Sequence, residues 1–203
     1  MILKKASRQA IVYACKRFHY AKSVPANVFG YSVFENQEWC GVVLFGTGAN
    51  NHIAMPYGMV QGEVIELVRV ALNGKHGKTS QAVATALRLL RKDCPLVKVV
   101  VSYADLDQDH LGIIYQATNW IYEKTVYKGQ TSAFIIEGKK VHLKTLHGKG
   151  LPQSIEGIRA KVDPDATVYK AKGKVKYIYP MTPELRQKFQ HLHQKYIKNA
   201  SEA

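Results

Sequence analysis

The sequence predicts an α/β fold with a mixed sheet of about six strands and flanking helices. An apolar strand at Glu63–Leu72, an amphipathic helix at Thr79–Lys92 and an apolar strand at Val99–Ala104 predict one parallel crossover at the centre of the sheet. Apolar segments joined by short polar connections, typical of β-hairpins, lie on both sides of this crossover. With 203 residues, 46% of them hydrophobic, the chain can bury a complete core.

The first elements are a helix and a hairpin. Ser7 is a suitable N-cap for a helix over Ser7–Tyr20, where apolar residues recur at helical spacing. The segments Val28–Glu35 and Trp39–Gly46, separated by three polar residues, predict a β-hairpin. The loop of residues 47–62 is long for a compact domain, which is typical of functional loops.

The crossover and the elements after it follow from the same patterns. The helix Thr79–Lys92 has one apolar stripe, and Pro95 lies beyond its end. Consecutive β-branched residues over Val99–Val101 predict a strand buried on both faces. A short helix, a strand and a closing hairpin follow, at Ile113–Ala117, at Trp120–Tyr122, and at Thr131–Gly138 with Lys139–Thr145.

The C-terminal part of the chain is different in character. Beyond Gly148 the periodicity fades into a basic, turn-rich segment, before a last helix that begins near Thr182 with Pro183 at its first position. We therefore expect a catalytic domain over residues 1–148 and a basic, irregular extension over residues 149–203 that packs on it.

Charge and cysteine content restrict the function. The net charge is +14; residues 138–203 hold 14 Lys and Arg against 5 Asp and Glu, whereas residues 1–137 hold 15 against 10. This concentration of positive charge predicts contact with nucleic acid. An odd number of widely spaced cysteines, no N-terminal signal pattern and no apolar run of about 20 residues favour an intracellular protein without a membrane partner.

The chemistry-bearing residues gather after the strand Val99–Ala104. Ser102, Tyr103 and Asp105 lie where this strand ends, and Asp107, Asp109 and His110 follow it. The carboxyl edge of such a strand is where ligands usually bind in α/β sheets, so the cluster can supply a general base, a positioning group or metal ligands. The alternative is an ordinary turn whose acids cap the next helix. Tyr115 and Trp120 can line a pocket for a flat ligand, or belong to the core.

A second candidate site precedes the helix Thr79–Lys92. The segment GKHGKTS (Gly74–Ser80) ends like a P-loop but lacks the glycine that an ATP-binding loop requires five positions earlier. Lys75 and Lys78 beside a helix N-terminus can still hold a phosphate. On the preceding strand, Arg69 either binds a phosphate or carboxylate, or pairs with an acid such as Glu66.

Several segments resemble the Mom proteins of tailed bacteriophages. They are GIIYQATNWIY (Gly112–Tyr122), VVVSYAD (Val99–Asp105) and ELVRVAL (Glu66–Leu72), and the segment Val162–Pro180 is similar to the family's C-terminal part. The resemblance covers roughly Val28–Pro180, and its most specific part is Tyr-Gln-Ala-x-Asn-Trp-x-Tyr. It implies a fold like that of the GCN5-related N-acetyltransferases. It also implies a cytoplasmic transferase of the bacterial host that converts adenine in phage DNA to N6-carbamoylmethyladenine, which blocks restriction.

In acetyltransferases of this fold, the loop and helix start after the fourth strand hold the pyrophosphate of coenzyme A. The resemblance places that site at Lys75–Ser80, so the donor-binding candidates are Arg69, Lys75, Lys78, Thr79 and Ser80. The sequence lacks the Gln/Arg-x-x-Gly-x-Gly/Ala signature there. Acetyl-CoA and an aminoacyl-tRNA such as glycyl-tRNA both remain candidate donors, and iron remains a candidate metal.

For this reaction, the polar residues gathered at the strand ends suggest roles for the remaining candidates. Asp105 or Asp107 accepts a proton from the adenine amine, and Tyr115 or Tyr122 protonates the leaving group. Ser102 serves as a polar group that positions the reactants. A flipped adenine is sandwiched by aromatic residues, and the basic C-terminal part grips phosphates; these DNA-binding candidates are Tyr57, Tyr103, Trp120, Lys170, Lys172, Lys174 and Lys176.

The expected partners are double-stranded DNA and, with an aminoacyl donor, tRNA. The oligomeric state is left open, with a dimer compatible with the sequence. The rival functions are a non-catalytic DNA-binding module and a small-molecule N-acetyltransferase on the same fold. Tight coenzyme A binding would favour the latter.

Overall fold

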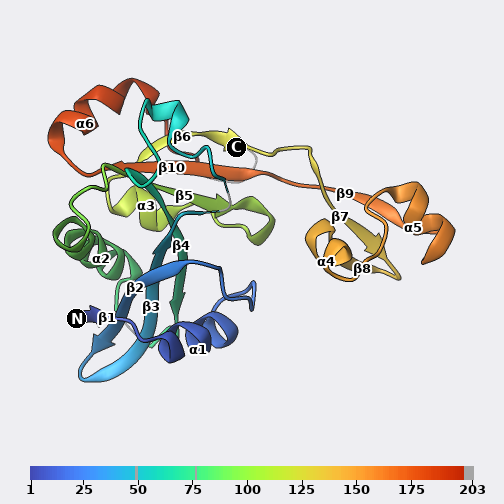
Figure 1. Ribbon diagram of the computed structural model, residues 1–203, viewed down its shortest axis with the longest axis horizontal. Coiled ribbons are helices and arrows are strands. Elements are labelled where there is room, and N and C mark those ends of the chain that lie inside the picture. Colours follow the sequence, from blue (N-terminus) through green and yellow to red (C-terminus); the bar gives the residue numbers. More distant parts are fainter. Residues whose placement is uncertain (49, 76, 199–203) are drawn as a thin grey trace. The chain divides into compact units, whose positions relative to one another are not determined.

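The computed structural model describes residues 1–198 except residues 49 and 76 (Figure 1). Its strands are β1 (Ile2–Lys5), β2 (Val28–Glu35), β3 (Glu38–Gly46), β4 (Val64–Leu72), β5 (Val99–Asp105), β6 (Ile121–Val126), β7 (Thr131–Ile136), β8 (Lys139–His142), β9 (Thr167–Lys170) and β10 (Lys174–Pro180). Its helices are α1 (Arg8–Phe18), α2 (Thr79–Asp93), α3 (Ile113–Ala117), α4 (Leu143–Gly148), α5 (Ile155–Lys161) and α6 (Pro183–Phe189). Short 3₁₀ helices are η1 (Met55–Tyr57), η2 (Leu106–Gln108) and η3 (Gln190–Leu192).

The larger sheet is mixed, as predicted. Within the described residues it has seven strands in the order β1-β2-β3-β4-β5-β10-β6. The pairs β1–β2, β2–β3 and β3–β4 are antiparallel, and β4 pairs with β5 in parallel. The predicted hairpin and crossover are thus confirmed, whereas β1 was not predicted because four residues with two lysines give no clear alternation.

Two helices cover opposite faces of the antiparallel half of the sheet. Leu44 of β3 packs with Ile11 and Cys15 of α1. Tyr31, which pairs with the neighbouring Val43, donates its hydroxyl hydrogen to Asp93 of α2. Since successive side chains of a strand point to opposite faces, α1 and α2 lie on opposite sides of β3. The Ser7 hydroxyl caps α1 by accepting from the Ala10 amide at 3.2 Å.

The segment predicted to be irregular contains a central strand. β10 lies between β5 and β6 in the larger sheet, and its residues Val175, Tyr177 and Ile178 are fully buried. The sequence of β10, KVKYIYP, does not predict an inner strand, because two lysines and a terminal proline are uncommon there. The prediction of an irregular extension is therefore wrong for these residues, and α5 and β9 are also regular.

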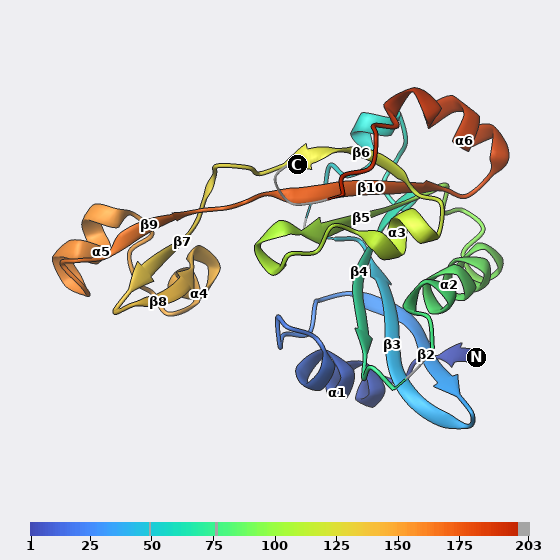
Figure 2. The same ribbon diagram turned by 180° about the vertical axis from the view of Figure 1, so that it is seen from behind.

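The chain forms two compact units. Unit 1 comprises Met1–Tyr103, Gly112–Lys124 and Lys176–Tyr196, and unit 2 comprises Ala104–Leu111, Thr125–Val175 and Ile197–Ala203. The described part of unit 2 has a three-stranded sheet in the order β8-β7-β9, which Figure 2 shows from behind. Phe134, Leu146 and Ile158 form its core with neighbouring apolar residues. The boundary predicted between residues 148 and 149 falls inside unit 2, and residues 199–203 lie outside the described residues.

The two units differ in charge in a way that the linear sequence conceals. Unit 1 contains 18 Lys and Arg against 7 Asp and Glu, whereas unit 2 contains 11 against 8. Most of the excess positive charge thus belongs to the unit that includes the N-terminal half. Among the helices of the described residues, none has the length and apolar character needed to cross a membrane.

Candidate functional site

The central feature of unit 1 is the separation of β4 from β5. Their parallel ladder joins Val64–Glu66 to Val99–Val101 and ends there, although β4 continues to Leu72. A β-bulge next to this point, where Leu44 pairs with Arg69 and Phe45 with Leu67, leaves Val68 as the extra residue of β4. Bulges bend a strand and redirect its side chains, so this one accompanies the separation of the two strands.

A buried pair of hydroxyl groups links the strands where the ladder ends. Ser102 is 1% exposed, and its Oγ lies 2.8 Å from the carbonyl oxygen of Leu67 and 2.8 Å from the hydroxyl oxygen of Tyr115. A serine hydroxyl has one proton, and a carbonyl oxygen can only accept. Ser102 therefore donates to Leu67 and accepts from Tyr115. This arrangement fixes the Tyr115 hydroxyl beside the diverging strands.

Local structure explains why Tyr115 reaches this position. Gly112 precedes α3 with φ +79°, and a Cβ on it would lie 2.3 Å from the ring of Tyr177, so only glycine lets the helix approach so closely. The Tyr115 ring then packs against Trp120 and Tyr177, with centroids 5.0 and 5.1 Å away. Burial raises the pKa of Tyr115 to about 12. Tyr115 is thus a neutral proton donor at physiological pH.

The N-terminus of α2 is the predicted donor site. Lys78 occupies the N-cap position without a side-chain cap, and the first turn, which includes Thr79 and Ser80, carries no acidic residue. Both features favour an anion. However, the amide of the preceding Gly77 donates to the carboxylate of Glu35, at the end of β2. Within this stretch, residue 76 lies outside the described residues.

The carboxylate of Glu35 limits how well the turn before α2 can bind the pyrophosphate of coenzyme A. A pyrophosphate bound at Gly77 would meet the Glu35 carboxylate and would have to displace it, since two anions cannot share one amide donor. Lys75 and Lys78 are exposed and can offset only part of this repulsion. With Glu35 in place, the turn is thus not preformed to bind a pyrophosphate. The sequence analysis missed Glu35, which contacts this turn only through the fold.

Arg69 lies on the part of β4 that has separated from β5. Its Nη1 donates to the carbonyl oxygen of Val68 at 2.8 Å, and its buried Nε has no hydrogen-bond partner within the described structure. Burial raises the pKa of the Cys15 thiol of α1, and the positive charge of Arg69 partly opposes this. A guanidinium with an unused buried donor suits a carboxylate or phosphate ligand.

Two residues predicted to contact DNA belong instead to a buried polar network. The Tyr57 hydroxyl donates to Oε2 of Glu123 at 2.6 Å, and Lys176 Nζ lies 3.0 Å from the same oxygen. Tyr57 is 3%, Glu123 8% and Lys176 7% exposed, so the structure contradicts the predicted roles of Tyr57 and Lys176 at the DNA surface. Burial, with the nearby Glu123 carboxylate, raises the pKa of Tyr57 above its ordinary range. Glu123 was not predicted as a site residue. The sequence feature that could have identified it is an acid directly after the apolar residues Trp120, Ile121 and Tyr122.

The other aromatic candidates differ in exposure. Trp120 is fully buried between the rings of Tyr115 and Tyr179, so the prediction that it stacks on a flipped base is wrong for this structure. Tyr122 is also buried, with its ring 5.7 Å from that of Tyr177. Tyr103 is half-buried beside an apolar cluster of unit 1 and keeps its candidacy for base stacking.

Asp107 links three segments of unit 2 through hydrogen bonds. Its carboxylate accepts from Lys140 Nζ at 2.9 Å, from the Lys172 amide at 2.9 Å and from the Tyr169 hydroxyl at 3.2 Å. Burial raises the pKa of Asp107, but these hydrogen bonds outweigh it and hold the pKa below its usual range. A carboxylate so stabilised is a weak base, which argues against Asp107 as the proton acceptor.

The remaining candidates of unit 2 have more accessible positions. Asp105 ends β5, is half-buried, and caps η2 by accepting from the Asp107 amide at 3.0 Å. It therefore performs the capping role that the alternative interpretation gave to these acids. Lys170, Lys172 and Lys174 are exposed, and Lys172 pairs with Asp109 at 3.0 Å. Their contact with DNA stays a prediction.

We expect Asp107→Asn to lower the free energy of unfolding by about 1–3 kcal/mol at neutral pH. Because the folded pKa of Asp107 is lowered, its contribution is complete above the ordinary value of about 4 and is lost as the pH falls through the folded pKa. Denaturant unfolding at pH values from neutral to acid should show the variant and the wild type converging. Asp109→Asn, at a side chain that is 80% exposed, is the control and should change little. A difference that does not depend on pH would contradict the prediction.

The candidate acids and histidines do not come together as a metal site. Among the described residues, no three His, Cys, Asp or Glu side chains are grouped closely enough to hold a metal ion. Iron thus stays a prediction, and no residue is assigned to it.

Two solved structures have the same fold. One is a spermidine N-acetyltransferase variant from Vibrio cholerae, with a TM-score of 0.51 at 8% sequence identity, covering 93% of this chain and 99% of the other. The other is an aminoglycoside N-acetyltransferase, with a TM-score of 0.50 at 11% identity, covering 90% and 96%. The chain therefore has the fold of the GCN5-related N-acetyltransferases.

The family is shown by the sequence itself. No curated protein sequence matches the chain. The model of the Mom protein family, by contrast, matches residues 1–198, which include all of unit 1, unit 2 except residues 199–203, and every candidate residue named above. The chain therefore belongs to the Mom protein family.

Proposed function

We propose that this protein transfers an activated acyl group to N6 of adenine in DNA and yields N6-carbamoylmethyladenine, which protects phage DNA from restriction. The observation that carries the proposal is the buried Ser102–Tyr115 hydroxyl pair where β4 and β5 separate. Membership in the Mom family supports DNA adenine as the acceptor. The acetyltransferase fold supports acyl transfer to an amine as the reaction class.

The acceptor amine is chemically difficult. The lone pair of adenine N6 is delocalised into the ring, and the amine is inaccessible inside a duplex. The base must therefore leave the stack, at a cost of a few kcal/mol. The half-buried Tyr103 offers a ring for the flipped base. Asp105, the last residue of β5, accepts the proton that N6 loses, a role left to it by the low pKa of Asp107.

The leaving group favours Tyr115 as the general acid. When N6 attacks the donor carbonyl, the leaving oxygen of an ester needs a proton, because an alkoxide is much more basic than a thiolate. Tyr115, with a pKa of about 12 and its hydroxyl placed by Ser102, gives that proton when its hydroxyl hydrogen turns from Ser102 Oγ to the leaving oxygen. Arg69, whose Nε has no partner in the described structure, can bind a carbonyl or phosphate oxygen of the donor.

A glycyl ester is the donor that this site supports best. Attack on glycyl-tRNA releases the terminal hydroxyl of the tRNA and gives a glycyl amide on N6, which is an isomer of the carbamoylmethyl product. A rearrangement then replaces the bond between N6 and the carbonyl carbon by one between N6 and the methylene carbon, while the glycyl nitrogen moves from the methylene carbon to the carbonyl carbon. The carboxylate of Glu35 at the α2 turn disfavours a pyrophosphate donor. The excess of 18 Lys and Arg over 7 Asp and Glu in unit 1 supports binding of nucleic acids.

The test is mass spectrometry of nucleosides from DNA of cells that express the protein. A new adenine nucleoside, heavier than deoxyadenosine by a carbamoylmethyl group, would support the proposal. Unmodified adenine together with DNA binding would support a non-catalytic DNA-binding module instead. Tight binding of coenzyme A in calorimetry, with unmodified DNA, would indicate a small-molecule N-acetyltransferase.

A further inference from the structure

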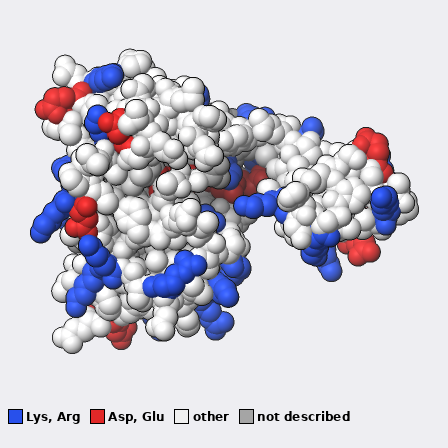
Figure 3. All heavy atoms as spheres, in the orientation of Figure 1, with Lys and Arg blue, Asp and Glu red and all other residues white. Residues whose placement is uncertain are grey.

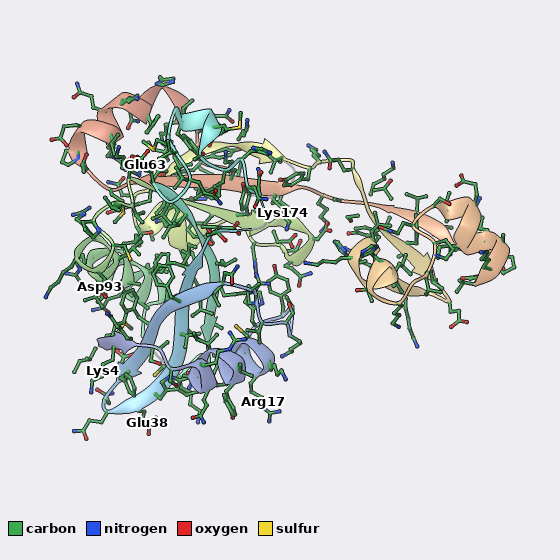
Figure 4. The ribbon with its side chains drawn as sticks, in the orientation of Figure 1. Lys4, Arg17, Glu38, Glu63, Asp93 and Lys174 are labelled. Atoms are coloured by element: carbon green, nitrogen blue, oxygen red, sulfur yellow. The ribbon has the colours of Figure 1, made fainter. Side chains whose placement is uncertain are left out.

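The N-terminal part of unit 1 has a surface that the proposed reaction does not use. Residues 1–34 contain no Asp or Glu and six cations: Lys4, Lys5, Arg8, Lys16, Arg17 and Lys22. Figure 3 shows Lys and Arg side chains gathered over α1 in the lower part of the picture. Figure 4 labels two of them, Lys4 on β1 and Arg17 on α1. This surface attracts polyanions.

An aromatic groove lies within this positive surface. It encloses about 670 Å³ between α1 and the first strands, and we call it the α1 groove; its aromatic and basic lining consists of Lys4, Lys5, Tyr13, Phe18, Phe34 and Trp39. The rings of Tyr13 and Phe18 each lie 5.7 Å from that of Trp39, centroid to centroid. The indole N–H of Trp39 donates to Ser32 at 3.3 Å, which holds the ring in place. Tyr13 is 55% exposed, so its ring is accessible to a ligand in the groove.

A second hollow shares Gln9 and Tyr13 with the α1 groove. It encloses about 620 Å³, and Arg8, Lys16 and Arg17 line it with apolar neighbours. Tyr13 lines both hollows, and none of their lining residues carries a carboxylate. Lys5 does lie 3.9 Å from Asp93, but at 84% exposure this pair leaves the lysine available. Cations thus line both of the hollows that the exposed Tyr13 ring borders.

We propose that the α1 groove binds an unpaired stretch of single-stranded DNA, with bases stacked on Tyr13 and its aromatic neighbours and phosphates on the surrounding cations. Aromatic rings beside cations are the two components of single-strand binding, because each base offers a face and each nucleotide a charge. A duplex keeps its base faces internal and cannot fill an aromatic groove. The choice of DNA rests on the proposed function, since strands must part around a flipped adenine.

The test measures fluorescence anisotropy of a labelled oligothymidylate with the full-length protein. This probe contains no adenine, so binding is read separately from modification, and failure of one does not imply failure of the other. Tyr13→Ala should weaken binding about tenfold. Tyr127→Ala, at a tyrosine of unit 2 with 47% exposure, is the matched control and should leave binding unchanged.

A charge variant separates binding from folding. Arg8→Glu places an acid in the first turn of α1, where a negative charge stabilises the helix. The variant should nevertheless bind the oligothymidylate more weakly, and the slope of log K against log salt concentration should become shallower by about one. The proposal is overturned if the wild type fails to bind the oligothymidylate at low salt, or if Tyr13→Ala and Tyr127→Ala weaken binding equally. It is also overturned if duplex DNA, or an oligouridylate of the same length, binds more tightly than the oligothymidylate and loses as much affinity in Tyr13→Ala.

Discussion

Tyr115→Phe is expected to lower the rate of adenine modification at least about 100-fold, the usual loss when a general acid is removed. The substitution deletes one oxygen and keeps the ring that packs against Trp120 and Tyr177. Ser102 keeps its hydrogen bond to the Leu67 carbonyl oxygen, so β4 and β5 stay linked where their ladder ends. The measurement is the fraction of modified adenine over time, by nucleoside mass spectrometry, at equal levels of folded protein.

Tyr177→Phe is the matched control for this experiment. Tyr177 is fully buried, its ring neighbours Tyr115, and burial likewise raises its pKa to about 12. Its hydroxyl accepts from Gln116 at 3.1 Å rather than joining the pair at the strand ends. We expect Tyr177→Phe to cost about 1 kcal/mol of stability and to keep most activity. Equal losses in the two variants, or full activity of Tyr115→Phe, would remove the general-acid assignment.

The sequence predicted the elements whose patterns are local. The N-cap at Ser7, the apolar stripe of α2 and the β-branched run of Val99–Val101 each depend on neighbouring residues, and all three elements are present. β10 could not be predicted in this way, because its burial depends on strands β5 and β6, which lie far away in the chain. Its lysines obscured the pattern, although Lys176 has a buried partner in Glu123.

The candidate site shows the same division. Ser102 and Tyr115 were predicted separately, from a strand end and a short helix, and the structure brings their hydroxyl groups together. Asp107 was predicted as a base, but sequence alone could not show that Lys140 and Lys172, more than thirty residues away, would hold it as an anion. The exposure of a side chain likewise depends on tertiary packing. The sequence therefore could not show that Trp120 is fully buried and cannot stack on a base.

Glu123→Ala is expected to lower the free energy of unfolding by about 3–5 kcal/mol, the cost of breaking a buried ion pair from one side. The change leaves the ammonium of Lys176, at 7% exposure, without its carboxylate, and it removes the acceptor of the Tyr57 hydroxyl. Lys124 also loses a contact of 3.6 Å, but its side chain is 55% exposed and can be solvated. Urea denaturation of the wild type and the variant at neutral pH measures the difference.

The double variant Glu123→Ala/Lys176→Met tests whether the loss comes from a buried unpaired charge. Removing both charges should restore part of the stability, because an apolar chain replaces the ammonium and only the Tyr57 hydroxyl stays unpaired. Glu63→Ala, which breaks the more exposed pair with Lys98, is the control and should destabilise much less. Since Tyr57 lies in η1 and Glu123 and Lys176 lie on adjacent strands, recovery would show that this network anchors the β3–β4 connection to the sheet by charge pairing. A double variant no more stable than Glu123→Ala would instead mean that packing, rather than charge, sets the cost.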